Sequence, residues 1–186
     1  MAKKNIIIIE GPSGVGKDTI INELISRYPD RFDRPINATT RPMRENEKQG
    51  NPYLFISEKE FLKLRESGEI FEHTIRHGTY RGMRKSSFDS ILNENKICLR
   101  DCDKYGLKAL KDVYGDQVLG IFLTVDKEVI KERLLSRNEP KESMISRLKD
   151  YDNTIKDAYY FDHIVENIDM ERTIEQILNI IDSRNK

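Results

Sequence analysis

One stretch near the N-terminus, Ile6–Thr19, constrains the fold more than any other part of the sequence. Ile6–Ile9 are β-branched and apolar, which is typical of a short strand buried on both faces. The glycine-rich segment Gly11–Gly16 follows, and glycine lets the backbone turn tightly and approach a ligand closely. After Lys17 the spacing becomes helical, with an apolar face of Ile20, Ile21, Leu24 and Ile25. We therefore expect a strand, a glycine-rich loop and a helix, in that order.

This order of elements favours the binding of phosphate. The loop amides and the helix N-terminus both attract an anion, and Lys17 can reach the outer phosphates of a nucleotide. The segment matches G-x-x-x-x-G-K-[ST] except at the last position, where Asp18 precedes Thr19. Aspartate is a good ligand for Mg²⁺, although it adds negative charge beside a polyphosphate. The alternative, a glycine-rich turn that happens to precede a lysine, is disfavoured by the strand and helix on either side. The expected phosphate-binding residues are Gly11, Ser13, Gly14, Val15, Gly16, Lys17, Asp18 and Thr19.

The composition restricts the class of protein. A chain of 186 residues fits one α/β domain. Basic and acidic residues number 32 each, so the net charge is zero, whereas a general nucleic-acid-binding protein is usually basic. Two cysteines without a secretion signal indicate a reducing compartment and no disulfide framework. The apolar run at Ile6–Ile9 is too short for a signal peptide or a membrane span. We expect a cytoplasmic protein that binds neither nucleic acid nor membrane.

Further along the chain, short apolar runs alternate with segments of helical periodicity. This alternation predicts an α/β fold with a doubly wound, mostly parallel sheet. The later strands are expected at 53–56, 69–74, 97–99, 118–123 and 163–166. Residues 77–82 resemble a turn. A long helix is expected to carry Met144, Ile145, Leu148 and Tyr151 on one face.

Two groups of charged residues could contribute to a site. Arg41 and Arg44 lie three positions apart in a proline-containing stretch, where their planar donors can converge on one phosphate. A solvated basic loop is the alternative for such a pair. Asp101 and Asp103 follow the buried strand 97–99, and ligands of open α/β sheets gather at the carboxyl ends of strands.

At this point the sequence resembles the guanylate kinases, a family of nucleoside monophosphate kinases with a P-loop. The resemblance spans nearly the whole chain. It depends on the segments 11–17, 39–44 and 50–57, on Phe71-Glu72, on 101–103 with Gly106, on Arg133-Leu134 with Arg137, and on Arg147-Leu148. It implies a P-loop NTPase fold in a single domain. Within that domain, a core of 1–33, 96–136 and 151–186 would carry a nucleoside-monophosphate-binding insert at 34–95 and a helical lid at 137–150.

The resemblance also implies roles for single residues. In such kinases two arginines and a tyrosine hold the phosphate of the acceptor, here Arg41, Arg44 and Tyr53, and a glutamate and an aspartate accept hydrogen bonds from guanine, here Glu72 and Asp103. Guanine offers two donors on that edge and adenine does not, so paired carboxylates select guanine. The remaining positions that match the acceptor site are Asn37, Tyr80 and Arg81.

For the donor, the resemblance implies ATP with Mg²⁺. The catalytic positions would be Lys17 and the lid arginines Arg133, Arg137 and Arg147, although solvated helix charges are the alternative for these arginines. Asp18 and Asp101 would bind the metal. The implied partners are the small molecules ATP and GMP, and the implied state is a monomer or a homodimer.

Four residues depart from the family pattern: Asp18, Asn37, Arg81 and Met83. Asp18 replaces the usual serine, Asn37 stands where a serine often contacts guanine, and Arg81 stands where the family usually has a tyrosine. The Lys17-Asp18 pair also resembles ribose 1,5-bisphosphate phosphokinase. Three hypotheses remain open: a kinase for GMP, a kinase of the same fold for another phosphorylated acceptor such as deoxy-GMP, a modified guanine nucleotide or ribose 1,5-bisphosphate, and a binding module without activity.

Overall fold

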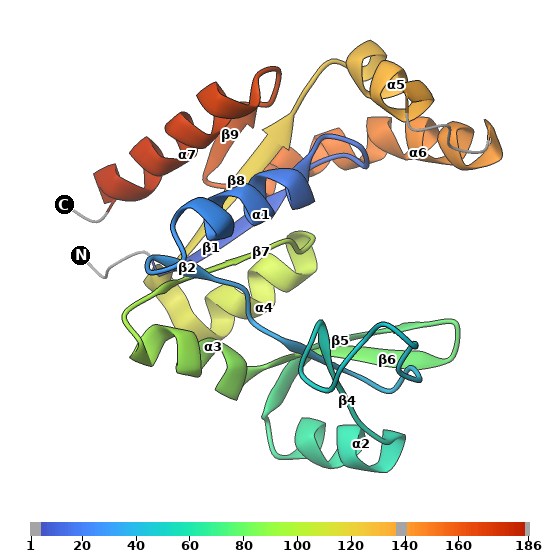
Figure 1. Cartoon of the computed structure of the whole chain (residues 1–186), viewed down its shortest axis with the longest axis vertical. Helices are drawn as coiled ribbons and strands as arrows, with labels where there is room; N and C mark the ends of the chain where they lie inside the picture. Colours follow the sequence, from blue (N-terminus) through green and yellow to red (C-terminus); the bar gives the residue numbers. More distant parts are fainter. Residues whose placement is uncertain (1–4, 137–140, 185–186) are drawn as a thin grey trace. The chain divides into compact units, whose positions relative to one another are not determined.

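The computed structural model describes residues 5–136 and 141–184. Its chain divides into two compact units. The first unit contains the chain up to Phe32 and from Leu99 onward, and the second unit runs from Asp33 to Cys98. Figure 1 shows the course of the chain through both units.

A five-stranded sheet forms the centre of the first unit. The strands lie in the order β2 (Phe32–Asp33), β7 (Ile97–Arg100), β1 (Ile6–Glu10), β8 (Val118–Thr124) and β9 (His163–Glu166). β8 pairs in parallel with β1 and with β9. All four isoleucines of β1 are fully buried. The run of β-branched residues therefore forms the buried strand that the sequence predicts.

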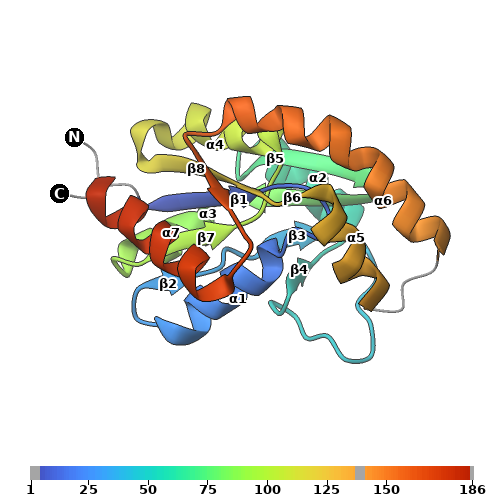
Figure 2. The same cartoon turned by 90° about the horizontal axis from the view of Figure 1, so that it is seen from above.

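Helices cover both faces of this sheet. α1 (Lys17–Arg27) and α7 (Met170–Arg184) lie on one face, and α4 (Lys104–Tyr114) and α6 (Lys141–Thr154) lie on the other (Figure 2). α5 (Lys127–Ser136) follows β8, and short 3-10 helices span Gly115–Gln117 and Ile155–Tyr160. This is the doubly wound α/β arrangement that the sequence predicts. Among the described residues, no helix is long and apolar enough to cross a membrane.

The second unit is built on a four-stranded mixed sheet. Its strands lie in the order β4 (Tyr53–Phe55), β3 (Asn37–Thr39), β6 (Thr79–Arg84) and β5 (Ile70–Arg76). β3 is parallel to β4 and antiparallel to β6, and β5 is antiparallel to β6. The unit also contains α2 (Glu58–Glu66) and α3 (Lys85–Asn93). The face of the sheet toward α2, the α2 face, buries Ala38, Phe61 and Ile70.

Two expectations about local structure are wrong. Residues 77–82 do not form a turn throughout: only His77 and Gly78 have positive φ, at 50° and 71°, and β6 begins at Thr79. Two such residues in succession are enough to connect a tight hairpin. Ile145 is 62% exposed, whereas Met144, Leu148 and Tyr151 are partly buried. Met144, Leu148 and Tyr151 follow one another at spacings of four and three residues, which keep them on one face of the helix. Ile145 directly follows Met144 and is therefore rotated by about 100° around the helix axis.

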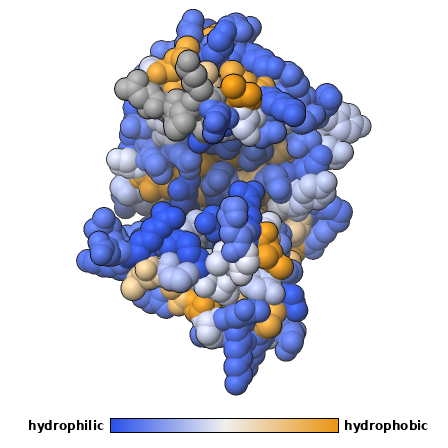
Figure 3. All heavy atoms as spheres, turned by 90° about the vertical axis from the view of Figure 1, so that its right-hand side faces the viewer, coloured by the Kyte–Doolittle hydropathy of each residue, from blue (hydrophilic) through white to orange (hydrophobic). Residues whose placement is uncertain are grey.

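The surface agrees with the high content of charged residues. Figure 3 shows one side of the molecule, which is mainly hydrophilic with small, separate apolar groups. Scattered apolar side chains of this kind are normal for a protein surface.

Candidate active site

The loop after β1 depends on glycine at both of its ends. Gly11 has φ of 153°, and a Cβ atom there would overlap the carbonyl oxygen of Leu123 in the neighbouring strand β8. Gly16 has φ of 106° and precedes α1, and a Cβ atom there would lie 2.7 Å from Nδ2 of Asn167. A side chain at either position would therefore displace the loop, because positive φ and close approach both require glycine.

The loop delivers the chain directly into the N-terminus of α1. No side chain of the described residues caps this helix end at Gly16. Asp18 and Thr19 lie exposed in the first turn. The first amide groups of a helix have no partner within the helix and attract an anion. The geometry suits a phosphate group at this end of α1.

Lys17 and Glu10, which flank the loop, form a charged pair. Nζ of Lys17 donates a hydrogen bond to the carbonyl oxygen of Gly11, lies 3.4 Å from that of Pro12, and is 3.8 Å from Oε1 of Glu10. Burial raises the pKa of Glu10 to about 7 and is only partly opposed by Lys17, while Asp101 and Asp103 raise the pKa further. Glu10 could not be recognised from the sequence, because a glutamate at the end of a strand carries no local sign of burial.

The raised pKa of Glu10 makes stability depend on pH. Between the unperturbed value of 4.5 and about 7, the folded chain holds a proton that the unfolded chain has released, so stability falls as pH rises through this range. The carboxyl is 16% exposed, and the shift corresponds to about 3 kcal/mol. We expect Glu10→Gln to abolish this part of the pH dependence.

Urea unfolding of the wild type and the variant, at about pH 5 and about pH 8, measures the effect. If the free energy of unfolding changed with pH by the same amount in the wild type and in Glu10→Gln, the assignment of the shift to Glu10 would be contradicted. An exposed glutamate, Glu132 on α5, offers a matched control variant, Glu132→Gln.

Two of the expected lid arginines contact the loop. Arg147 of α6 donates to Oγ of Ser13 at 2.9 Å. Arg133 of α5 donates to the carbonyl oxygens of Val15 at 3.1 Å and Asn167 at 2.8 Å. Arg137 lies outside the described residues. The structure thus brings Arg133 and Arg147 to the loop that carries Lys17.

A cavity of about 270 Å³ lies beside the loop. Its walls come from the loop and the start of α1, from α5, and from the segment between β9 and α7; the lining residues are Gly14, Gly16, Thr19, Ile20, Arg133, Ser136, Asn167, Ile168 and Met170. Asn167 is buried and donates from Nδ2 to the carbonyl oxygen of Val15 at 2.7 Å. Neither Asn167 nor Ile168 was expected from the sequence, because no local pattern marks them.

Asp101 and Asp103 follow β7 as expected. Oδ1 of Asp103 accepts hydrogen bonds from the amides of Tyr105 at 3.0 Å and Gly106 at 2.9 Å, which caps α4. Both aspartates act electrostatically on Glu10, so carboxylates of β1 and β7 gather at one edge of the sheet. Burial also raises the pKa of the Cys102 thiol, so this thiol stays protonated.

Oxygen-rich surroundings of this kind fit Mg²⁺. Among the described residues, no three acidic, histidine or cysteine side chains form a complete metal site. Mg²⁺ in nucleotide-binding proteins needs only one or two carboxylates, because phosphates and water supply its other ligands.

In the second unit, the register places most of the expected acceptor residues on one face. Asn37 pairs with Tyr53, Thr39 with Arg81, and Thr74 with Arg81. Paired residues in a sheet point to the same face, and alternate residues of one strand do so too. The face away from α2, the outer face, therefore carries Asn37, Tyr53, Glu72 and Arg81.

Tyr80 is not part of this group. Its ring lies 5.1 Å from that of Phe61 in α2 and 6.2 Å from that of His73, both measured between centroids. A Cβ atom at Gly82 would also lie 2.8 Å from Phe61, so Tyr80 and Gly82 point to the α2 face. The structure thus separates Tyr80 from Arg81, its neighbour in the sequence.

Arg41 is held in a two-pronged ion pair. Its guanidinium donates to both carboxylate oxygens of Glu47, at 2.8 and 2.7 Å, and the amide of Arg44 donates to Glu47 at 2.8 Å. The hydrogen bonds from Arg41, and next that from Arg44, lower the pKa of Glu47 to about 2. The guanidinium carbon of Arg41 lies 5.6 Å from the centroid of the Tyr53 ring. A carboxylate in this fork has the geometry that a phosphate would take.

Loops of this geometry, which join a buried strand to a helix and carry a lysine before it, define the P-loop nucleotide-binding proteins. The first unit is a P-loop fold. The family model of guanylate kinase matches residues 3–184.

Comparison with single proteins agrees. The guanylate kinase of Thermotoga maritima is 35% identical over 182 residues, which cover 97% of this chain and 87% of that protein. The guanylate kinase of Helicobacter pylori is 36% identical over 177 residues, with 95% and 85% covered. The crystal structure of guanylate kinase from Anaplasma phagocytophilum aligns over 100% of this chain and 88% of that chain, with a TM-score of 0.70 and 25% identity. The chain belongs to the guanylate kinase family.

Proposed function

We propose that this protein transfers the γ-phosphoryl group of ATP to the 5′-phosphate of GMP and so forms ADP and GDP. The observation that carries the proposal is the outer face of the second unit, which presents a carboxylate, Glu72, together with Tyr53 and an arginine fork at Arg41. Carboxylates accept hydrogen bonds from guanine, and the fork matches a phosphate. The P-loop of the first unit supplies a site for the donor.

The acceptor residues have separate roles in this proposal. Arg41, Arg44 and Tyr53 hold the phosphate, and Asn37 donates to guanine. Glu72 and Asp103 accept from the N1–H and the amine of guanine. Asp103 keeps this capacity because only its Oδ1 atom caps α4.

The donor site follows from the loop and its neighbours. The loop amides of 11–19 and Lys17 bind the phosphates of ATP, and Arg147 lies close enough to the loop to neutralise their charge. We assign the adenine of ATP to the cavity beside the loop. Its apolar wall includes Ile20 and Ile168, and Arg133 presents a planar guanidinium that can stack on a base.

The transfer needs no general base. The acceptor is a phosphate oxygen, which is already largely ionised at neutral pH because its second pKa is about 6. The protein therefore aligns two anions and neutralises the charge of a loose transition state. The guanylate kinase family consists of ATP-dependent kinases that normally use Mg²⁺. When bound with ATP, Mg²⁺ adds positive charge at the transferred group, and Asp18 and Asp101 are the residues we propose to hold it.

A coupled assay of ADP release tests the proposed function. The acceptors are GMP, deoxy-GMP, AMP, UMP and ribose 1,5-bisphosphate, each with ATP and Mg²⁺. We expect turnover with GMP and little with AMP or UMP, because neither of those bases presents the two donors of guanine. Turnover with ribose 1,5-bisphosphate but with none of the nucleotides would contradict the proposal. Absence of turnover with every acceptor tested would contradict it as well.

A further inference from the structure

The ammonium group of Lys17 has three oxygen neighbours in the chain itself. It donates a hydrogen bond to the carbonyl oxygen of Gly11, lies 3.4 Å from that of Pro12, and lies 3.8 Å from Oε1 of Glu10. An ammonium group has three N–H donors, so these three oxygens can take all of them. To bind the phosphates of a nucleotide, Lys17 must therefore exchange at least one of these oxygens for a phosphate oxygen.

Glu10 is the charged member of this set. It is the last residue of β1, where it pairs with Phe122 of β8 and accepts a hydrogen bond from the amide of Gly11. The side chains of Glu10 and Lys17 are only 16% and 19% exposed. Charges that are partly buried are screened less by water and salt than charges on the surface. The carboxylate therefore competes for the ammonium more strongly than a neutral carbonyl oxygen does.

The other acidic groups around Glu10 make it depend on Lys17. Asp101 and Asp103, which follow β7, act on Glu10 as like charges, and the protonated thiol of Cys102 between them adds no positive charge. Lys17 opposes this repulsion. If phosphates take Lys17 over, an ionised Glu10 loses the attraction of its cation and lies near a further anion. Both effects cost free energy, and the cost lowers the affinity for phosphates.

We propose that Glu10 is a positioning residue that competes with the phosphates of the nucleotide for Lys17, and that it thereby limits how tightly the loop holds ADP after the transfer. The proposal rests on the proposed function, since it concerns the donor site of the same reaction. Glu10 lies just before the first glycine of the phosphate-binding motif, so the motif itself gives it no role.

Calorimetric binding of ADP at about pH 8 tests the competition. EDTA is present, so that no divalent cation alters the charge near the carboxylates, and adenosine, which lacks phosphate, is measured by displacement of ADP. The variants are Glu10→Gln, which keeps the shape and removes the charge, and Glu10→Asp, which keeps the charge. Glu175→Gln is the matched control, because Glu175 is exposed on α7. Thermal unfolding verifies that each variant is folded.

We expect Glu10→Gln to tighten the binding of ADP by about 3- to 10-fold and to leave adenosine unchanged. Glu10→Asp should stay closer to the wild type, and Glu175→Gln should equal it. At about pH 5.5 the difference between the wild type and Glu10→Gln should disappear, because burial raises the pKa of Glu10 to about 7 and the carboxyl is then protonated.

A double-mutant cycle with Lys17→Met tests whether Glu10 acts through Lys17. In the Lys17→Met background, Glu10→Gln should change the affinity for ADP by clearly less than in the wild-type background. An equal change in both backgrounds would show that Glu10 does not act through the lysine, and would overturn the inference.

Three further results would overturn it: weaker binding of ADP by Glu10→Gln, an equal change in the affinity for adenosine, or a difference that persists at about pH 5.5. If the wild type binds ADP and Glu10→Gln equals it, this inference alone fails. If the wild type does not bind ADP, the proposed function fails together with it.

Discussion

Replacing Lys17 by methionine should lower the turnover number by at least about 100-fold while the protein stays folded. The ammonium group of Lys17 contacts the carbonyl oxygens of Gly11 and Pro12, in the loop that leads into the N-terminus of α1. In the proposed function it is the positive charge that the loop itself would bring to the transferred group. Methionine preserves the aliphatic stem and removes only the charge, so the loss measures electrostatic stabilisation of the transition state.

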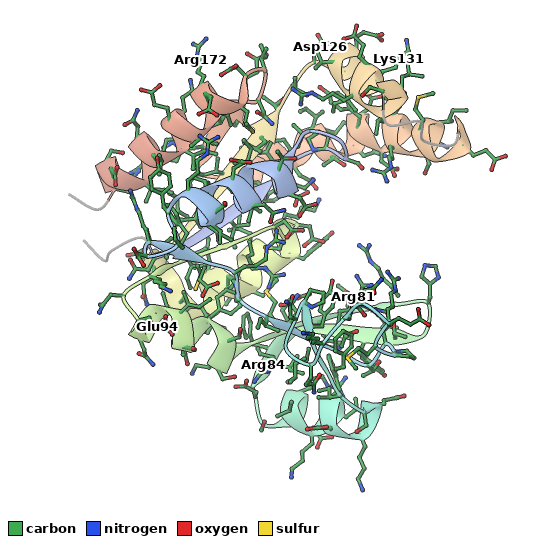
Figure 4. The ribbon with its side chains drawn as sticks, in the orientation of Figure 1. Arg81, Arg84, Glu94, Asp126, Lys131 and Arg172 are labelled. Carbon is green, nitrogen blue, oxygen red and sulfur yellow. The ribbon has the colours of Figure 1, made fainter. Side chains whose placement is uncertain are left out.

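The measurement is ADP release at saturating ATP and GMP, together with thermal unfolding of the variant. Lys131→Met is the matched control, since Lys131 is exposed on α5 and pairs with Glu128 (Figure 4). Near-normal turnover of the Lys17 variant, with the control unchanged, would refute the assignment of Lys17 to catalysis.

Glu72→Gln should lower kcat/KM for GMP by at least about 100-fold. A carboxylate accepts hydrogen bonds at both oxygens, whereas glutamine of the same shape turns one of them into a donor that faces a donor of guanine. When the amide NH2 of glutamine faces an N–H group of guanine, neither donor has an acceptor, and the hydrogen bond that Glu72 would accept is lost. The weak activity with AMP should change little, because adenine lacks the donor groups from which Glu72 would accept hydrogen bonds.

The decisive measurement is the ratio of kcat/KM for GMP to that for AMP. Glu66→Gln serves as the control, because Glu66 is exposed at the end of α2. An equal loss of kcat/KM with both nucleotides would indicate that Glu72 stabilises the fold and does not recognise the base.

The elements around the P-loop could be predicted because their signals are local. Ile6–Ile9 can be read as a buried strand, and the glycines at 11, 14 and 16 all adopt positive φ in the structure. Aspartates at helix starts are a local signal of the same kind: Asp126 and Asp169 accept hydrogen bonds from the amides of Glu128 and Arg172. Such signals involve only residues that are close in the sequence, so they can be recognised without knowledge of the tertiary structure.

The direction of Tyr80 and Arg81 could not be predicted in the same way. Both residues are polar enough for a binding site, and the turn expected at 77–82 left the strand register undefined. A shift of one residue in register exchanges the two faces of a strand. The structure resolves the question through Gly82, which leaves room for Phe61 on the α2 face and thereby directs Arg81 to the outer face.

Long-range contacts set the remaining limit. Asn167 is separated from Val15 by 152 positions, and nothing near Asn167 indicates that it would bond to a phosphate loop. Glu10 and Glu47 are similar cases, because their altered pKa values come from burial and from partners that only the folded chain assembles.

The hydrogen bonds to Val15 join the phosphate-binding loop to segments that are made much later during translation. Arg133 and Asn167 both brace the carbonyl oxygen of Val15, and Thr173 of α7 in turn donates to Oδ1 of Asn167 at 3.0 Å. The ribosome makes the loop long before it makes these braces. A nascent chain that still lacks β9 and α7 thus contains the whole phosphate-binding loop, but it lacks Asn167 and Thr173. The hydrogen bonds of Asn167 to Val15 and of Thr173 to Asn167 therefore form only once the C-terminal part of the chain is present.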